Sequence, residues 1–418
     1  MANMRSVRKK TLKSCAIYGA LKAHAKKHRF SFHTPGHKRG AWDITELAYS
    51  DNLACPKGCI ATAEKDIARI IGAHTSFILT DGSTSGVLAM LHSAKRTGVK
   101  TVAVKRDTHK SFWNGCALLG LTPIVYTDDD LERAIKQADA LFLTSPNYYG
   151  EVAPLRQIRA LCDSENTLLL IDGAHGGHLH VHKDLYAGAY ADMWVDGVHK
   201  SLPALTQGAI VSARTEEYAG VLRESVGVFR TTSPSYPIMA SVEYAVKYPE
   251  NKKLPALVRA LAKAYPNRVQ VNADWTKVCV RVGEQAFTAQ TALENRGVYP
   301  EFCDGEYICF YLSPATTARA FRVLKNSVAW LCKEFTPNEK TVQSIPAPLV
   351  TVENTDTAWV DLEKAVGCVC AENCGLFPPC TPLVVQGERI TQEHISLLQS
   401  ASNVYGLVDG KIKIYKNI

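Results

Sequence analysis

Short apolar runs alternate with amphipathic stretches along the first half of the chain, from about residue 76 onward. Seven runs have the length and composition of buried strands: Ser76–Thr80, Lys100–Val104, Pro123–Tyr126, Ala140–Thr144, Thr167–Ile171, Ala191–Val195 and Gly208–Ser212. Several intervals between them show helical spacing: Ser85–Lys95, His109–Leu119, Asp129–Gln137 and Leu155–Cys162. Strands that alternate with helices indicate a mainly parallel sheet with helices on both faces.

The pattern changes after Arg230–Pro237, a segment rich in turn-forming residues. Beyond a helix-like stretch at Ile238–Lys247, strand-like and helix-like segments follow in mixed order: Val269–Ala273, Lys277–Val282, Glu284–Asn295, Glu306–Leu312 and Thr316–Phe335. A chain of 418 residues is also longer than a single core usually supports. We predict an N-terminal helical segment at 1–50, a large domain at 51–245 and a smaller C-terminal α+β domain at 246–418.

Composition narrows the class of protein. The formal net charge is +8, but the charges are scattered, which favours solvated helix faces over a nucleic-acid-binding arm and suits an anionic ligand. No apolar run reaches the roughly 20 residues that a membrane span needs, and the basic N-terminus lacks the apolar stretch of a secretory signal. Thirteen irregularly spaced cysteines indicate reduced thiols and a cytoplasmic protein.

Four of these cysteines lie close together near the C-terminus, at Cys368, Cys370, Cys374 and Cys380. Structural zinc sites usually present one closely spaced cysteine pair and a second pair at a distance. The spacing here does not follow that pattern, so we predict ordinary thiols and no metal site.

Two motifs at predicted strand ends suggest a phosphorylated, ring-containing ligand. The small residues of Asp81–Gly86 join a strand to a helix, where backbone N–H groups and the helix dipole favour a phosphate; the alternative is a plain capped turn. Asp172 ends the apolar run Leu168–Ile171 and precedes Gly173-Ala174-His175. A carboxylate there can pair with a protonated ring nitrogen, as pyridoxal chemistry requires, or it can cap the next turn.

Two further strand ends carry a lysine and a histidine. Lys200 follows His199 in a loop containing glycine and proline, where desolvation would lower the amine pKa and create a nucleophile. The alternative is a solvated surface lysine. His109 stands at another strand-to-helix crossing, where it can stack on an aromatic cofactor or simply open a helix. Each motif is weak alone, but all four fall on one predicted edge of the sheet.

With these motifs in this order, the chain resembles the ornithine/lysine/arginine decarboxylases, which have the aspartate aminotransferase-like (type I) pyridoxal-phosphate fold. The matching segments span roughly residues 30–395: Phe32–Lys38, Asp81–Gly86, Thr108–Ser111, Ser145–Gly150, Asp172–His175, His199-Lys200, Thr231–Pro237, Phe377–Pro379, Pro382-Leu383 and Gln386–Glu388. The resemblance implies a mainly parallel seven-stranded sheet sandwiched by helices in the large, cofactor-binding domain. It also implies a short form without an N-terminal wing domain.

The resemblance implies a role for each matching residue. Lys200 would be the Schiff-base lysine, and Asp172 would hold the pyridinium N–H of pyridoxal 5'-phosphate so that the ring stays an electron sink. Ala174 and His109 would lie on opposite ring faces, and His175 would lie near the ring hydroxyl. The phosphate would be bound by residues of two loops: Ser83, Thr84, Ser85 and nearby His199.

The resemblance also implies a homodimer whose subunits share active sites. Thr231 and Thr232 would approach the partner's phosphate, and Pro35-Gly36-His37 would line its entrance. A basic substrate needs an acidic partner, for which Glu301, Asp304 and Glu306 are candidates; the alternative for each is a solvated loop residue. His37, Glu301 and Asp304 are therefore the candidate substrate residues.

The implied activity is decarboxylation of lysine, arginine or ornithine to a polyamine precursor and CO2, by a carbon–carbon lyase. The alternatives are another pyridoxal-phosphate reaction on an amino acid, such as transamination, aldol cleavage or desulfurisation, and a non-catalytic cofactor-binding protein. Two departures from the family pattern bear on activity. Gly197-Val198 stands where many relatives carry Ser-Thr, and Gly173 stands where they often carry glutamate. No nucleic-acid or membrane partner is expected.

Overall fold

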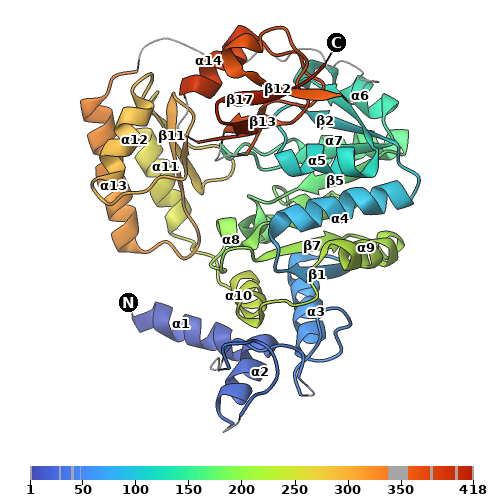
Figure 1. The fold of residues 1–418 in the computed structure, drawn as a ribbon. Coiled ribbons are helices and arrows are strands. Elements are labelled where there is room, and N and C mark those ends of the chain that lie inside the picture. The colour runs from blue at the N-terminus through green and yellow to red at the C-terminus, as the bar shows by residue number, and fades with distance from the viewer. Residues whose placement is uncertain are drawn as a thin grey trace.

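The computed structural model describes residues 2–27, 30–38, 42–47, 49–337, 356–376, 380–400 and 403–416. Its largest element is a seven-stranded sheet with the order β1–β7–β6–β5–β4–β2–β3 (Figure 1). The strands are β1 (Thr75–Leu79), β2 (Thr101–Lys105), β3 (Thr122–Tyr126), β4 (Ala140–Thr144), β5 (Leu168–Asp172), β6 (Met193–Asp196) and β7 (Ala209–Ala213). Only β7 runs against its neighbours in this sheet. The predicted fold class and all seven strands are confirmed, with bounds shifted by two residues at most.

Helices cover both faces of this sheet. One face carries α4 (Gly82–Arg96), α5 (Lys110–Leu119) and α9 (Glu216–Phe229), and the other carries α3 (Cys59–Ile71), α6 (Leu131–Gln137), α7 (Leu155–Glu165) and α10 (Tyr236–Val246). In β5, Leu168 and Leu170 belong to the first core, whereas Leu169 and Ile171 belong to the second. Because successive strand residues face opposite sides, a doubly covered strand must be apolar at every position.

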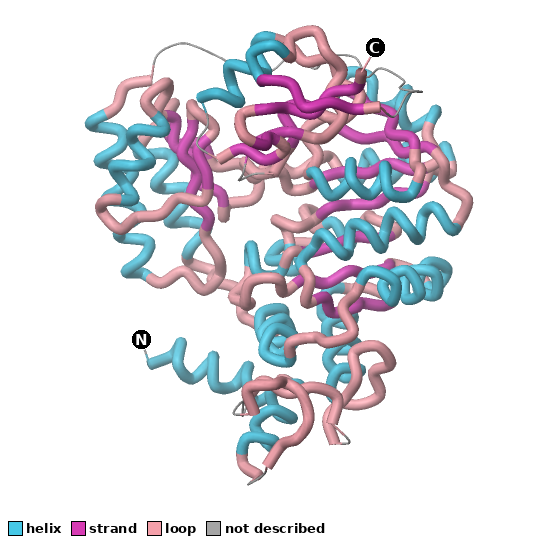
Figure 2. Tube along the Cα trace, in the orientation of Figure 1, coloured by secondary structure: helices cyan, strands magenta, loops and turns pink. Residues whose placement is uncertain are grey.

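The N-terminal segment is fixed to the sheet domain through a buried carboxylate. It holds α1 (Ala2–Lys13) and α2 (Ala16–Ala25), which lie at the bottom of Figures 1 and 2. Glu243 of α10 accepts hydrogen bonds from the backbone N–H groups of Ala16 (2.7 Å) and Ile17 (2.9 Å). Lys247 donates to Glu243 (2.8 Å) and to Asp66 (2.7 Å). A carboxylate at these first free N–H groups stabilises α2.

A four-stranded antiparallel sheet forms a second layer structure, at the left of Figure 1. Its order is β10 (Phe302–Cys303), β11 (Tyr307–Tyr311), β9 (Lys277–Arg281) and β8 (Val269–Gln270). Helices α11 (Leu254–Ala264), α12 (Ala286–Glu294) and α13 (Ala318–Glu334) pack with one face of it. The other face carries a small aromatic cluster with Cys279, Phe302 and Cys309, against which Tyr148 and Tyr149 pack.

The C-terminal part builds two small three-stranded sheets around a core of its own. Its elements are β12 (Thr357–Asp361), β13 (Cys374–Leu376), β14 (Pro382–Val384), α14 (Gln392–Ser400), β15 (Val404–Tyr405), β16 (Leu407–Val408) and β17 (Lys411–Tyr415). Short helices complete the chain: η1 (Asp128–Asp130), η2 (Gly177–Val181), η3 (Ala187–Ala189), α8 (Val198–Ser201) and η4 (Leu362–Lys364). Residues 246–418 thus contain two separate cores, and their division from the rest as one domain stays a prediction.

A buried ion pair attaches this C-terminal part to the large sheet. Arg106, which directly follows β2, pairs with the fully buried Glu388 and donates to the carbonyls of Pro382 (2.9 Å) and Leu383 (2.7 Å). The motif Gln386–Glu388 therefore has a structural role, whereas Phe377–Pro379 lies outside the described residues. Within the described part of the chain, no helix is long and apolar enough to cross a bilayer.

Candidate active site

Three of the predicted motifs meet at the carboxyl ends of neighbouring strands. Asp172 is the last residue of β5, Lys200 lies in α8 just after β6, and His109 precedes α5 just after β2. The ends of parallel strands lie at one edge of the sheet. Charge interactions link Lys200 to both Asp172 and His109, which places the three side chains in one site.

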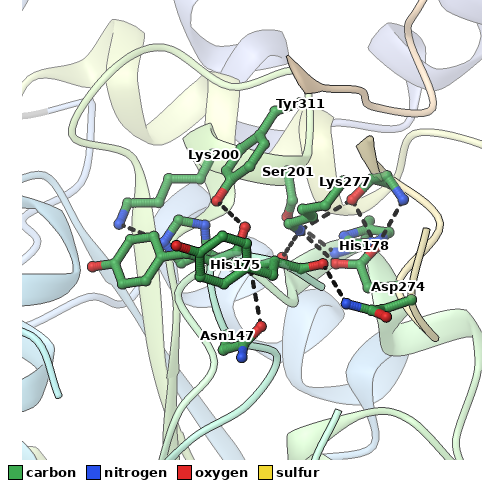
Figure 3. A network of polar contacts seen from close by, with 12 residues as sticks. Asn147, His175, His178, Lys200, Ser201, Asp274, Lys277 and Tyr311 are labelled. Carbon is green, nitrogen blue, oxygen red and sulfur yellow. Dashed lines mark hydrogen bonds and ion pairs between the residues drawn. The ribbon is translucent and has the colours of Figure 1, made fainter. Parts of the chain in front are cut away.

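Lys200 projects from the four-residue helix α8 toward His175. Its Nζ lies 3.3 Å from His175 Nε2, as Figure 3 shows. Burial lowers the pKa of the Lys200 amine below its ordinary value, although the carboxylates of Asp172 and Glu301 oppose this shift. An amine of lowered pKa is a nucleophile, because more of it is unprotonated near neutral pH.

His175 is buried between two aromatic rings. Its ring centroid lies 4.6 Å from that of Tyr148 and 5.5 Å from that of Tyr311, both in edge-to-face geometry. Burial, and then the nearby cations Lys200 and Lys277, hold its pKa well below the ordinary value. Among the described residues, its Nδ1 atom has no hydrogen-bond partner. His175 is therefore a neutral imidazole with one ring nitrogen at Lys200 and the other unsatisfied.

Asp172 is a buried carboxylate with few protein partners. Its Oδ1 accepts a hydrogen bond from the backbone N–H of Ala174 at 3.0 Å. Burial raises the pKa of Asp172, and the cation of Lys200 opposes that rise. Ala174 is buried directly beyond it. A buried carboxylate with a single backbone donor is suited to receive an N–H or a positive charge from a ligand.

His109 caps α5. Its Nδ1 lies 2.8 Å from Ser111 Oγ and accepts from the Ser111 backbone N–H at 3.2 Å. Burial, followed by the charges of Lys200 and Lys110, lowers its pKa to about 3. The imidazole is therefore neutral, with the local hydrogen bonds of Nδ1 fixing its orientation.

The predicted phosphate turn lies at the start of α4. Gly82 opens this helix with φ of 77°, a conformation that favours glycine. Ser83 is half-buried and Thr84 is exposed, whereas the buried Ser85 donates to the carbonyl of Gly82 at 3.0 Å. Ser83, Thr84 and the helix N–H groups are thus better placed for an anion than the Ser85 hydroxyl.

Other predicted cofactor residues lie around this turn. The backbone N–H of Thr231 donates to Asp81 in the same subunit at 3.2 Å, so the Thr231-Thr232 segment borders the turn. His199 Nδ1 lies 3.0 Å from the carbonyl of Gly208. Their roles toward a phosphate stay predictions.

The three candidate substrate residues lie in different surroundings. Glu301 is exposed yet within electrostatic reach of Lys200. Asp304 accepts from Tyr149 Oη at 2.6 Å and from two backbone N–H groups, which occupies its carboxylate. His37 is exposed and lies 3.0 Å from Asp43. Of the three, Glu301 is the one whose charge raises the pKa of the Lys200 amine.

The sequence pattern did not single out a buried ionic network beside His175. Lys277 donates to the carbonyl of His175 at 2.7 Å and pairs with Asp274, whose other oxygen lies 2.9 Å from His178 Nε2 (Figure 3). Burial alone would raise the pKa of Asp274, but the neighbouring His178 and Lys277 hold it far below its ordinary value. The available signal was an Asp and a Lys three residues apart at the start of an apolar strand.

The two departures from the family pattern have a steric basis. A Cβ atom at Gly173 would lie 3.1 Å from both Asp196 Oδ1 and the carbonyl of Val195. At Gly197 it would lie 2.7 Å from the carbonyl of Ala174. Glycine at both positions lets the loops after β5 and β6 approach each other closely. No cluster of three or more side chains suited to a metal ion occurs among the described residues.

Comparison with known sequences finds relatives along nearly the whole chain. The uncharacterized protein YaaO of Bacillus subtilis is 29% identical over 95% of this chain and 96% of its own. An arginine decarboxylase of Halalkalibacterium halodurans is 26% identical over 92% of each chain.

Solved structures share the fold. The constitutive lysine decarboxylase of Escherichia coli has a TM-score of 0.73 and 17% identity, covering 99% of this chain and 84% of its own. A structure of SPT with PLP has a TM-score of 0.59 and 15% identity, covering 77% and 85%. The sequence profile described as "Orn/Lys/Arg decarboxylase, major domain" matches residues 41–136 and 130–281. That match spans more than half of the chain, which therefore belongs to the Orn/Lys/Arg decarboxylase family.

Proposed function

We propose that this protein is a pyridoxal-phosphate-dependent decarboxylase of a basic amino acid: lysine, arginine or ornithine. One observation carries the proposal: Lys200, an amine of lowered pKa, lies 3.3 Å from the neutral His175, at the strand ends where Asp172 stands. Membership of the family supports the same activity.

The polar atoms of the site fit the cofactor. Asp172 offers a buried carboxylate with one recorded backbone donor, and His175 Nδ1 is buried and unsatisfied among the described residues. We propose that Lys200, Asp172, Ala174 and His109 hold the pyridine ring. The phosphate would be held at the start of α4, by Ser83, Thr84 and Ser85, with His199 nearby. When bound, the cofactor supplies an electron sink for the bond that breaks as CO2 leaves.

The side chains of this chain then have distinct tasks. Lys200 would hold the cofactor through its amine. His175 Nε2, which burial keeps unprotonated, would accept a hydrogen bond from the Lys200 amine. Asp172 would pair with the protonated ring nitrogen of the cofactor, which would keep the ring electron-poor.

We propose that Glu301 receives the distal cation of the substrate, supported by its electrostatic reach to Lys200. The product would be a diamine or agmatine, and thus a polyamine precursor. We also propose a cytoplasmic homodimer with shared active sites, in which Thr231, Thr232 and Pro35–His37 approach the partner. The nearly complete exposure of Phe30 and Phe32 next to this segment supports burial in an assembly, and the free thiols of the chain suit a reducing compartment.

The test is a panel of amino acids incubated with purified protein and pyridoxal phosphate, assayed for CO2 and for the amine product. We expect CO2 and one matching amine from a basic amino acid, and borohydride reduction that labels Lys200. Lys200→Ala should lose both, whereas Lys136→Ala, at an exposed ion pair on α6, should lose neither. Keto-acid or aldehyde products without CO2 would point to another reaction on the same cofactor.

A second variant tests substrate recognition. Glu301→Gln should raise KM for the basic substrate by about tenfold, because a charge-assisted hydrogen bond contributes about 1.5–3 kcal/mol. Glu294→Gln is the matched control, since Glu294 lies on α12 and bonds Gln290. An unchanged KM in Glu301→Gln would remove Glu301 from the substrate site.

A further inference from the structure

Lys277 is the most deeply buried cation beside the site. Its side chain is 1% exposed, and that of its partner Asp274 is fully buried. Lys277 Nζ donates to Asp274 Oδ2, to Thr276 Oγ1 (3.0 Å) and to the carbonyl of His175 (2.7 Å). These three acceptors match the three N–H donors of an ammonium group. The lysine is thus held in one geometry.

Asp274 is equally well bonded. Its Oδ1 accepts from the backbone N–H and the hydroxyl of Thr276, at 3.0 and 2.7 Å, and lies 2.9 Å from His178 Nε2. A buried ion pair often stabilises a fold no more than apolar residues of similar volume would, because both charges lose their hydration. The presence of this network is therefore weak evidence that it stabilises the fold. It is better evidence that the network fixes the geometry of the residues around it.

The network joins three separate segments at His175. Lys277 begins β9, His178 lies in η2 just beyond His175, and Asp274 donates its backbone N–H to the carbonyl of Gly150 at 2.9 Å. The contact with Gly150 is tight, since a Cβ atom there would lie 2.7 Å from the Asp274 carbonyl. The Asp274 main chain thus links the start of β9 to the loop before α7, and the Lys277 side chain links it to the loop after β5.

Of the two rings that pack on His175, that of Tyr311 contacts the same network directly. Tyr311 pairs directly with Lys277 across β11 and β9, and the Lys277 ammonium lies 5.2 Å from the Tyr311 ring centroid. Tyr311 Oη donates to the carbonyl of Tyr148 at 2.8 Å. Lys277 therefore contacts both the main chain of His175 and the Tyr311 ring that packs on it, and Figure 3 shows Lys277, Tyr311 and His175.

We propose that Lys277, Asp274 and His178 form a positioning network that holds His175 Nε2 in reach of the Lys200 amine. The network touches neither reacting atom, so these are positioning residues. This inference rests on the proposed function, because the role of His175 at Lys200 belongs to that function. A misplacement of about 1 Å in such a group can lower a rate by as much as about 100-fold.

The decisive variant is Lys277→Met/Asp274→Asn, which removes both charges together and nearly conserves volume. Replacing both members of a buried pair often leaves stability nearly unchanged, so a folded protein is expected. The matched control is Lys247→Met/Glu243→Gln, which removes a comparably buried pair at α10, where Glu243 bonds the start of α2.

Two readouts separate positioning from stability. The first is two-bond 1H–15N correlation of the histidine rings in cofactor-free protein, with His175 assigned from a His175→Gln spectrum. We expect the His175 signals to shift or broaden in the first double variant and to stay unchanged in the control. The second is turnover, where we expect kcat to fall at least about tenfold with KM changed less than about threefold.

The inference is overturned if the folded Lys277→Met/Asp274→Asn protein keeps both the parental His175 signals and the parental kcat. If that variant does not fold, Thr276→Val decides, since it removes only a hydroxyl from the network and should shift the same signals by less. Unmoved His175 signals in that protein would overturn the inference. Should the parent protein lack decarboxylase activity, the proposed function fails, while the cofactor-free spectra still decide the inference.

Discussion

Two groups of polar side chains meet at His175, and they differ in how fully their hydrogen-bonding capacity is used. At the strand ends of the large sheet, His175 Nδ1 and Asp196 Oδ1 are buried without a hydrogen-bond partner among the described residues, and Asp172 has one recorded backbone donor. On the β9 side, Lys277 bonds three acceptors and Asp274 is bonded at both oxygens, although among the described residues His178 Nδ1 has no hydrogen-bond partner.

This difference indicates that the strand-end residues bind a ligand and that the residues on the β9 side hold the site in place. Unpaired buried polar atoms cost free energy, so a fold keeps them where a ligand or a proton will use them. Fully bonded charges lose stability when one member is removed, because the other is left buried and alone. Substitutions at the strand ends should therefore change mainly the chemistry, whereas removing a single charge from the network should also lower stability.

The largest expected effect is in the network. Lys277→Met alone should lower the free energy of unfolding by about 3–5 kcal/mol, because Asp274 would remain as an uncompensated buried charge. Denaturant unfolding of the cofactor-free protein measures this. Lys136→Met, at an exposed pair with Glu132, should leave it nearly unchanged. A similar small loss in both variants would show that the two regions do not differ as described.

Asp172→Asn should have the opposite effect to Lys277→Met: a large loss of activity and a small change in stability. We expect kcat to fall by about 100- to 1,000-fold, comparable to the loss of one preorganised electrostatic group. The free energy of unfolding should change by less than about 1 kcal/mol, since burial already disfavours the charged form of this carboxyl. Product assay and denaturant unfolding, done on one preparation, measure both. Retained turnover with a large stability loss would assign Asp172 a structural role.

The strand-end half of this comparison was predictable from the sequence. Apolar runs of strand length ended at Asp172 and at Asp196, and parallel strands must end at one edge, so Lys200, Asp172 and His109 were expected to meet. The local sequence pattern suffices to predict this site, because the direction of the parallel strands alone places these residues at one edge of the sheet. The contact of Lys200 with His175 follows from the same geometry.

The network half was not predictable in this way. Lys277 begins KVCVR, which reads as an ordinary strand with a solvated first residue. Its burial depends on how the four-stranded sheet packs against the loop at Gly150 and the loop at His175, contacts between residues more than 100 positions apart. Strand periodicity sets which face Lys277 shares with Cys279 but not what covers that face.

A glycine after β6 lets us test the close approach of the two loops at the strand ends. Gly197→Ala should lower the free energy of unfolding by about 1–3 kcal/mol, because the added methyl group would meet the backbone carbonyl of Ala174, which cannot move aside easily. Gly220→Ala is the control, since its Cβ would meet nothing within 4 Å in α9 and should stabilise by about 0.5–1 kcal/mol. Equal unfolding midpoints for both variants would contradict the close approach of the two loops.

Asp196 gives the mildest test, through pH. Burial raises its pKa to about 7, although Tyr186 and Trp194 donate to Oδ2. The unfolded chain releases this proton near the ordinary aspartate value, so between about pH 4 and about pH 7 the folded state binds more protons than the unfolded state. The free energy of unfolding should therefore fall as pH rises through this interval, by at most about 1.4 kcal/mol per pH unit.

Asp196→Asn cannot titrate, so its unfolding free energy should lose that downward slope between about pH 4 and about pH 7 relative to the parent. Denaturant unfolding at several pH values measures the difference between the two slopes, and Asp129→Asn, at an exposed residue of η1, controls for a general charge effect. Identical slopes in parent and Asp196→Asn would mean that the buried carboxyl is charged in the folded protein. Asp196 would then resemble the charged Asp274 rather than Asp172.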